Sequence, residues 1–251
     1  MSSTPLVGVV VPAHDEEELL ADCLAGLREA ARAVADRARV CVVVVADDCS
    51  DGTEALARRH RVGVVRVAAH NVGRARAAGA DVLLSRPAGP ATWLATTDAD
   101  SVVPPDWLAA QLDARDAGAD AWVGTVEVAD WSGLPAPVRA RYRAAYAHRA
   151  GGDRHRHVHG ASLGVAARAY RGVGGFPSLA SGEDVALVRR LDEAGLRVLR
   201  DPVHPVATSA RTAARAPDGF ASHLRGLAEM HVIPAAPGTS PHEGGSAARI
   251  S

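Results

Sequence analysis

Short, unbroken runs of valine alternate with longer amphipathic segments along the first half of this chain. The run Val42–Val45 has no polar residue on either face, so a strand made of it must be covered on both sides. Strand and helix follow one another four times: Val7 to Val11 and Glu16 to Arg37; Val40 to Ala46 and Thr53 to His60; Gly63 to Val67 and about Gly73 to Leu84; Thr92 to Thr97 and a helix opened by Pro104. We therefore predict an α/β fold, with a doubly wound, mostly parallel sheet flanked by helices.

Two carboxylates, Asp98 and Asp100, follow the last of these strands. Open α/β sheets bind their ligands at the carboxyl ends of their strands. Carboxylate oxygens suit Mg²⁺ or Mn²⁺, and an ion held by so few protein ligands completes its shell with water and substrate phosphates. In isolation such a pair is better explained as a solvated turn, but further polar motifs accompany it here. The pair therefore indicates a divalent metal site and a phosphorylated substrate.

Charge and cysteine content exclude several classes of function. The chain has 251 residues and a net charge of −1, so no overall field recruits nucleic acid or an anionic membrane. All 28 basic residues are arginine, and without lysine neither a P-loop nor a pyridoxal Schiff base can form. Cys23, Cys41 and Cys49 have no Cys-x-x-Cys spacing, which argues against a disulfide framework or structural zinc and favours the cytoplasm. We expect no transmembrane segment, because no apolar run approaches the roughly 18 residues needed.

Polar residues also follow the first two strands. The first strand runs into Pro12-Ala13-His14-Asp15-Glu16-Glu17, although the helix dipole alone would favour acidic residues there. The second runs into Asp47-Asp48-Cys49-Ser50-Asp51-Gly52-Thr53. Ser50 or Asp51 suffices to cap the next helix, which leaves Asp48 to face the crevice. A carboxylate in that place can accept a hydrogen bond from a base N–H or a ribose hydroxyl.

With the segment Asn71 to Gly79, the order of motifs resembles family 2 glycosyltransferases of the glycosyltransferase-A fold. This chain supplies, in the family's order, Val11 to Glu17, Asp47 to Thr53, Asn71 to Gly79, Asp98-Ala99-Asp100, Val173-Gly174-Gly175-Phe176 and Gly182-Glu183-Asp184. The resemblance covers about residues 6 to 210, and six ordered motifs are far more specific than any one of them. The second motif is one residue shorter than the common form.

The resemblance implies inverting transfer of a sugar from a nucleoside diphosphate sugar, UDP- or GDP-linked, to an acceptor hydroxyl. It implies that Asp48 contacts the nucleobase, that Arg76 faces the nucleotide or its phosphates, and that Asp98 lies near the ribose. Asp100 would bind the Mg²⁺ or Mn²⁺ that bridges the diphosphate, and Asp184 matches the catalytic base of the family. From the first motif it assigns three more residues to the donor site: Pro12, His14 and Glu16.

The role of Asp184 can also be argued from chemistry. Direct displacement needs a carboxylate on the face opposite the leaving group, placed to take the proton of the attacking hydroxyl. Glu183 and Asp184 begin a predicted helix after Gly182, so both could simply complement the positive end of that helix. Together with the other motifs, the catalytic interpretation is favoured.

Histidine and arginine residues add further candidates. Related enzymes sometimes add a histidine from the region of His204, which makes it a candidate for an extra metal or phosphate contact, and Arg211 can neutralise the diphosphate. His155, His157 and His159 would share one face of a strand, yet we assign no zinc to them, because exposed histidines in a basic loop are commoner than zinc sites.

We predict one domain over residues 1–233, with a nucleotide-binding half at about residues 6–128, an acceptor-side half at 129–233 and a disordered tail at 234–251. The rhythm changes after the apolar segment Ala121 to Val128. Beyond it we expect helices at about Val138 to Ala150, Glu183 to Ala194 and Phe220 to His231, with short strands around Val198 and Val206. The acceptor (a small molecule, a glycan or a lipid-linked group) is not specified by these residues, so the protein can act in the cytoplasm or at the inner membrane face.

Two other functions stay open at this point. A nucleotidyltransferase that makes the activated sugar uses a similar sheet, but it usually carries a Gly-rich loop with Arg or Lys where this chain has Pro12-Ala13-His14-Asp15. A non-catalytic sugar-nucleotide-binding protein would have no need of both Asp100 and Asp184.

Overall fold

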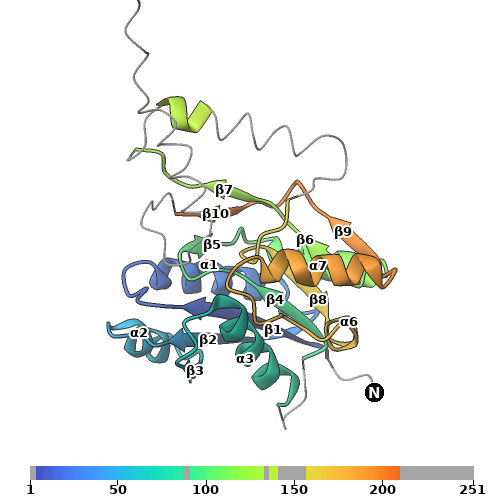
Figure 1. Cartoon of the computed structure of the whole chain (residues 1–251), viewed down its shortest axis with the longest axis horizontal. Helices are drawn as coiled ribbons and strands as arrows, with labels where there is room; N and C mark the ends of the chain where they lie inside the picture. The colour runs from blue at the N-terminus through green and yellow to red at the C-terminus, as the bar shows by residue number, and fades with distance from the viewer. Residues whose placement is uncertain (1–3, 87–90, 133–135, 141–156, 210–251) are drawn as a thin grey trace, which may run out of the picture.

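Four parallel strands form one side of a large sheet (Figure 1). They are β1 (Leu6–Ala13), β2 (Arg39–Asp47), β3 (Gly63–Val67) and β4 (Trp93–Thr96), in the order β3-β2-β1-β4. Beyond β4 follow β8 (Leu163–Ala166), β6 (Ala121–Val123) and β9 (Val198–Arg200). The strand β8 runs antiparallel to both of its neighbours, so the seven-stranded sheet is mixed but mostly parallel. The computed structural model describes residues 4–86, 91–132, 136–140 and 157–209.

Helices cover both faces of this sheet, as the valine-rich strands require (Figure 1). They are α1 (Leu20–Ala33), α2 (Thr53–Arg59), α3 (Val72–Leu84), α4 (Trp107–Asp116), α6 (Ala167–Gly172) and α7 (Glu183–Glu193), and residues 136–140 are also helical. The helix α3 lies close to β1 and β2 because it presents Gly79 to them: a Cβ there would lie 2.6 Å from Val10 Cγ1 and 2.8 Å from Val45 Cγ2.

Three fully buried tryptophans fill the core between the sheet and α4. The rings of Trp107 and Trp122 meet edge to face, with centroids 6.4 Å apart. Trp93 Nε1 donates to Gln111 Oε1 (2.9 Å), so this buried indole is hydrogen-bonded as well as packed.

A second, three-stranded sheet lies above the first in Figure 1, in the order β5-β10-β7. Its strands are β5 (Ser101–Val102), β10 (Val206–Thr208) and β7 (Val126–Val128). The apolar segment Ala121 to Val128 therefore forms two strands, because β6 pairs with β8 in the large sheet while β7 pairs with β10 in the small one.

The predicted fold class is confirmed, and the four strands predicted before Pro104 differ from the observed ones by at most two residues at either end. The first helix is shorter than the predicted Glu16 to Arg37, since it starts at Leu20 and ends at Ala33. The predicted helix at Phe220 to His231, most of Val138 to Ala150 and the tail at 234–251 lie outside the described residues. In the described part of the chain, no helix combines the length and apolarity that crossing a bilayer requires.

Candidate active site

Three polar segments meet at one edge of the large sheet. The strand β1 pairs in parallel with β2 and β4, in a register that sets Ala13 opposite Ala46 and Val10 opposite Thr96. The residues that follow these strands therefore leave the sheet side by side: His14 after β1, Asp48 after β2 and Asp98 after β4. Pro12 is the second-last residue of β1 and is paired with Val45 in β2.

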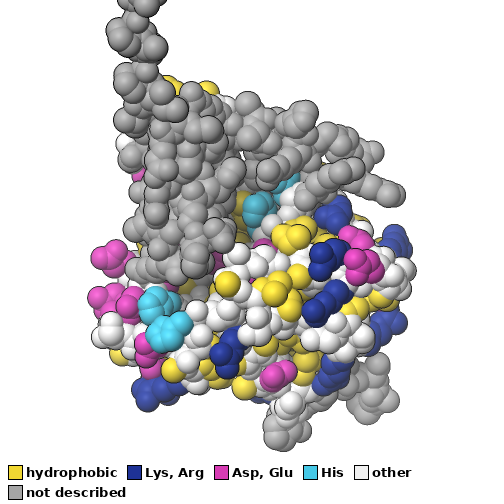
Figure 2. Space-filling view, viewed as in Figure 1, with side chains coloured by type: hydrophobic (Ala, Val, Ile, Leu, Met, Phe, Trp, Pro, Cys, Tyr) yellow, Lys and Arg dark blue, Asp and Glu magenta, His cyan; other side chains and the backbone are white. Residues whose placement is uncertain are grey.

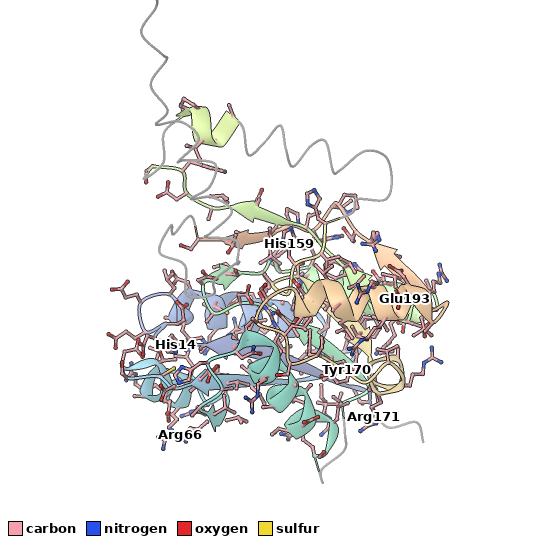
Figure 3. The ribbon with its side chains drawn as sticks, in the orientation of Figure 1. His14, Arg66, His159, Tyr170, Arg171 and Glu193 are labelled. Atoms are coloured by element: carbon pink, nitrogen blue, oxygen red, sulfur yellow. The ribbon has the colours of Figure 1, made fainter. Side chains whose placement is uncertain are left out.

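Histidine and acidic side chains gather over the ends of β1 and β2, at the left in Figure 2. The exposed carboxylate of Asp48 lies 3.2 Å from His70 Nε2. The ring of His70 meets that of His14, labelled in Figure 3, edge to face at 6.3 Å. His14 Nδ1 lies 2.6 Å from the carbonyl oxygen of Asp47. This corner thus presents a carboxylate and two imidazoles to solvent at a strand end.

Asp47 and Asp48 have opposite environments although they are adjacent. The buried carboxylate of Asp47 accepts hydrogen bonds from three backbone N–H groups, those of Ala69 (2.6 Å), His70 (3.0 Å) and Asn71 (3.0 Å). Asp47 therefore fixes the loop that carries His70. The backbone at Asp48 then turns into the left-handed region (φ +51°), which directs its side chain outward.

The start of α3 packs tightly against the segment before α7. Asn71 caps α3, since its Oδ1 accepts from Arg74 N (2.9 Å), and its Nδ2 donates to Leu179 O (2.6 Å). A Cβ at Gly73 would lie 2.7 Å from Pro177 O and 3.0 Å from Glu183 Cβ. The spacing Asn-x-Gly in the sequence thus reflects a close approach of two segments about 105 residues apart along the chain.

Arg76 occupies the interior of this contact. Its side chain is 5% exposed, and it forms ion pairs with Glu183 through Nη1 and with Asp98 through Nη2, the latter at 2.5 Å. Burial lowers the pKa of the Arg76 guanidinium, but the carboxylates of Asp98, Glu183 and Asp184 outweigh it and raise that pKa. Burial raises the pKa of Glu183, and the positive charge of Arg76 reduces this rise without cancelling it. The residue predicted to face the nucleotide is therefore enclosed between two protein carboxylates.

Asp184 lies beside this ion-pair cluster at the start of α7. Its Oδ2 accepts from Gly160 N (2.7 Å) and its Oδ1 accepts from Val185 N (2.7 Å). Gly160 O in turn accepts from Thr96 Oγ1 at the end of β4 (2.6 Å). Gly160 therefore joins the predicted base to the strand that carries Asp98.

The carboxylates of Asp98, Asp100 and Glu16 all act on the buried thiol of Cys23. The thiol of Cys23 donates to Asp98 O (3.4 Å), and its pKa is raised first by burial and then by the carboxylates of Asp98, Asp100 and Glu16. Ser101 Oγ donates to Asp100 Oδ1 (3.2 Å), and Ser209 N donates to Asp100 O (3.2 Å). This donor set consists of carboxylate oxygens, which fit the requirements of Mg²⁺ or Mn²⁺.

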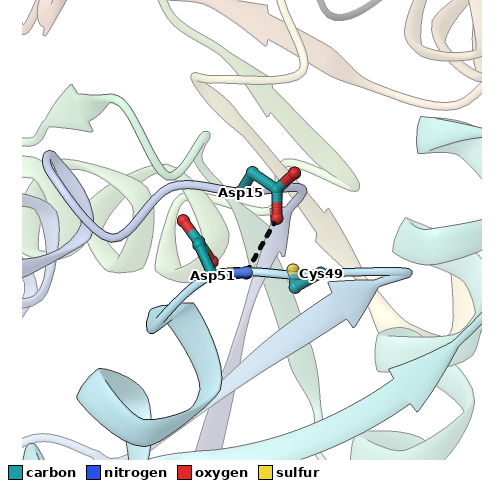
Figure 4. Close-up of side chains that lie close together, drawn as sticks. All are labelled: Asp15, Cys49 and Asp51. Atoms are coloured by element: carbon teal, nitrogen blue, oxygen red, sulfur yellow. Dashed lines mark hydrogen bonds between the residues drawn. The ribbon is translucent and has the colours of Figure 1, made fainter.

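Asp15, Cys49 and Asp51 form another group, whose ligand atoms lie within 4.8 Å of one another (Figure 4). Asp15 Oδ1 accepts from Ser50 N (2.7 Å) and Asp51 N (3.2 Å), and these bonds lower the pKa of Asp15. Burial raises the pKa of Cys49, whose thiol donates to Ala13 O (3.4 Å). The group ties the loop after β1 to the loop after β2, and a protonated thiol is a poor ligand for a hard cation.

The imidazole of His204 contacts two carboxylates other than Asp100. Residue Ser209 contacts Asp100, whereas His204 lies before the other end of β10, with Nδ1 2.9 Å from Asp201 Oδ2 and Nε2 3.6 Å from Asp106 Oδ2. The rings of His157 and His159 stack with centroids 5.8 Å apart, and Figure 3 labels His159. Arg211 and His155 lie outside the described residues.

Two contributors to the site were missed by sequence reasoning. Gly160 belongs to none of the six motifs, and its contacts with Asp184 and Thr96 depend on long-range packing. Glu183, the first residue of α7, was expected only to complement the helix dipole together with Asp184, and its burial against Arg76 also depends on long-range packing.

Solved structures of several glycosyltransferases share this fold. One is that of residues 1–349 of S. aureus TarS in complex with UDP-GlcNAc, which has a TM-score of 0.60 and 15% sequence identity and covers 85% of this chain and 61% of that one. Another is that of the mannosyltransferase PcManGT from Pyrobaculum calidifontis in complex with GDP-Man and Mn²⁺, which has a TM-score of 0.61 and 20% identity and covers 90% of this chain and 70% of that one. A third is that of glucosyl-3-phosphoglycerate synthase from Mycobacterium tuberculosis in complex with Mn²⁺, UDP and phosphoglyceric acid. It has a TM-score of 0.54 and 16% sequence identity, and covers 82% of this chain and 72% of that one. The chain thus spans less than two thirds of the TarS structure, and at these identities the likeness shows the glycosyltransferase-A fold alone.

Sequence comparison identifies the family. No curated protein matches the chain. Residues 8–171 match the model described as "Glycosyl transferase family 2", and this match runs from β1 to α6 through the three strand ends described above. Because it covers more than half of the chain and agrees with the fold, the chain belongs to glycosyl transferase family 2 and is a glycosyltransferase.

Proposed function

We propose that this protein transfers a sugar from a UDP- or GDP-linked donor to an acceptor hydroxyl, with inversion at the anomeric carbon. The observation that carries the proposal is the connection of Asp98, after β4, to Asp184, on α7, through Arg76, Glu183 and Gly160. Through these contacts, Asp98 of the predicted donor site is connected to Asp184, the predicted base. The chain covers only part of TarS, so the activity of the whole protein belongs to this proposal.

The donor's nucleobase is proposed to bind at Asp48. Uracil and guanine both present a ring N–H beside a carbonyl oxygen, which suits a carboxylate acceptor next to an imidazole that can donate. Asp48 and His70 provide that pair 3.2 Å apart, with His14 at the edge of the His70 ring. The solved structures with UDP-GlcNAc and GDP-Man support a donor of this class. Pro12 and Glu16 are proposed to contribute to the same donor site.

Asp100 is proposed to hold a divalent cation, Mg²⁺ or Mn²⁺, near Asp98. When bound, such an ion neutralises the negative charge that develops on the departing nucleoside diphosphate. The structures of two similar enzymes contain Mn²⁺, which supports this assignment. A metal contact from His204 would require it to leave Asp201 and Asp106, so we propose Asp100 as the principal ligand. A contact of Arg211 with the diphosphate stays a prediction.

Asp184 is proposed to act as the general base. Its carboxylate would take the proton of the acceptor hydroxyl while that oxygen bonds to the anomeric carbon and the bond from this carbon to the diphosphate oxygen breaks. The N–H groups of Gly160 and Val185 orient the carboxylate. The acceptor, the division at residues 128/129 and a place in the cytoplasm or at the inner membrane face stay predictions.

The decisive test combines binding and product analysis. We expect UDP or GDP to raise the thermal stability of the protein only with Mn²⁺ or Mg²⁺, since a ligand at about 100 times its Kd adds roughly 2.7 kcal/mol. Incubation with the matching nucleotide sugar and a panel of acceptors should then give a glycoside of inverted anomeric configuration by NMR. A protein that binds the donor without transfer would be a sugar-nucleotide-binding protein, and release of pyrophosphate from a sugar phosphate and a nucleoside triphosphate would identify a nucleotidyltransferase.

A further inference from the structure

We infer that Arg76 is a positioning residue that holds the donor side and the base side of the active site in register, and does not itself bind the donor phosphates. The inference rests on the proposed function for what the two sides do. The contacts of Arg76 carry it. Its guanidinium is buried, and each terminal nitrogen is paired with a protein carboxylate: Glu183 on α7 and Asp98 after β4.

A phosphate contact would need the opposite arrangement. An arginine that recognises phosphate presents its planar fork to the ligand, with two N–H groups available for bidentate hydrogen bonds. Here the Arg76 side chain is 5% exposed, and Gly160 packs against the face of the guanidinium. Both terminal nitrogens of Arg76 already pair with protein carboxylates, and a donor phosphate that replaced Glu183, whose side chain is 4% exposed, would leave a buried carboxylate unpaired.

Gly160 extends the unit to the base. A Cβ on Gly160 would come within 2.5 Å of all three terminal atoms of the Arg76 guanidinium, so this position has no room for a side chain. The N–H of the same residue donates to Asp184 Oδ2, and its carbonyl oxygen accepts from Thr96 Oγ1. Arg76 therefore supports Asp184 by two routes, through Glu183 at the start of α7 and through the backbone of Gly160.

Lysine cannot replace arginine in this place. One guanidinium bridges two carboxylates on different elements because its two terminal nitrogens are held apart in a plane, whereas an ammonium is a single point. Arg76→Lys keeps the charge but should bring only one carboxylate into contact. We therefore expect the Gly160–Asp184 hydrogen bond to open more often in this variant while the rest of the domain stays folded.

Hydrogen exchange measured by mass spectrometry tests this without a substrate. In Arg76→Lys we expect exchange about 10- to 100-fold faster in peptides that contain the amides of Gly160 and Val185, with β1 and β2 unchanged. Arg168→Lys is the matched control, because Arg168 also pairs with an aspartate (Asp120, 2.6 Å) but has an exposed side chain. Equal protection of the Gly160 peptide in Arg76→Lys and wild type would overturn the inference, as would a uniform rise over the whole domain.

Kinetics then separates positioning from phosphate binding. Glu183→Gln should lower kcat about tenfold or more with little change in donor Kd, since it affects the base side only. Arg76→Lys should lower kcat as well, and in the double variant the two losses should not add, because both act through one contact. A large loss of UDP or GDP affinity in Arg76→Lys with normal kcat at saturating donor would make Arg76 a phosphate ligand instead. If the wild type binds no nucleoside diphosphate, the proposed function fails while the exchange result still decides the role of Arg76.

Discussion

The backbone N–H groups of Gly160 and Val185 each donate to one carboxylate oxygen of Asp184. The backbone therefore fixes the orientation of this carboxylate. In Asp184→Asn we expect turnover to fall about 10²- to 10⁴-fold, as after loss of a general base, while donor affinity changes little. Folding should survive because asparagine is accepted at a helix start. Transfer rate and donor Kd are to be measured on one preparation, and near-normal turnover would exclude Asp184 as the base.

Asp100 is the residue at which metal dependence should be lost. In Asp100→Ala we expect the Mn²⁺-dependent part of UDP or GDP binding to disappear, because a hard cation loses its carboxylate ligand. Isothermal titration with and without Mn²⁺ measures this difference directly. Asp113→Ala removes an exposed carboxylate on α4 and serves as the control. An unchanged response to Mn²⁺ in Asp100→Ala would place the cation elsewhere.

Sequence patterns predicted the exposed residues of the site better than the buried ones. Asp48 could be singled out because nearby residues sufficed to cap α2, and it is indeed exposed at the strand end. The surroundings of Arg76 could not be predicted in the same way, since its partners Asp98 and Glu183 lie 22 and 107 residues away along the chain. Charge alone cannot tell an arginine that meets a ligand from one that neutralises buried carboxylates.

At the scale of elements, the closeness of α3 to the sheet depends on Gly79. We expect Gly79→Ala to lower the free energy of unfolding by about 1–3 kcal/mol, because the added methyl overlaps Val10 and Val45 in the core. Gly172→Ala is the matched control: it lies in α6 with nothing within 4 Å of the new Cβ, and it should be neutral or stabilising by up to about 1 kcal/mol. Chemical denaturation of both variants measures the difference, and equal stabilities would show that α3 can shift without cost.

The same scale shows where local patterns lose their predictive power. The helices and the parallel strands followed from hydrophobic periodicity within about 15 residues. The break between β6 and β7 at Gly124 did not, because it is set by partners in two different sheets: β8 and β10. An apolar segment is thus divided into two strands when its two ends pair with strands of different sheets.

At the scale of the whole molecule, Asp201 lies in the connection between β9 of the large sheet and β10 of the small one. Burial raises the pKa of Asp201, but hydrogen bonds from Val203 N and from His204 outweigh it and lower the pKa below the ordinary 3.8. A depressed carboxylate pKa adds stability above the unfolded-state value, and this stability is lost as the pH falls through the folded-state value. We therefore expect Asp201→Asn to destabilise the protein at pH 7 and the difference from wild type to shrink below about pH 4.

Urea titrations from pH 3 to 7 would measure this dependence, with the exposed Asp36→Asn as control. If the free energies of unfolding of Asp201→Asn and wild type differed by the same amount over this range, the negative charge of Asp201 would make no contribution to stability. His204 pairs with the same carboxylate, so Asp201→Asn should also weaken the link to Asp106.

The strand order of the small sheet determines when its strands can pair during synthesis of the protein. Its central strand, β10, comes last in the chain, whereas its outer strands β5 and β7 are made about 100 and 80 residues earlier. Within the described residues, neither outer strand has another partner in that sheet. Among the described strands, β5, directly after Asp100, and β7 therefore pair within this sheet only once β10 has been synthesised. A chain truncated before Val206 would keep β1 to β4 but would leave the edges of β5 and β7 open to association with other chains.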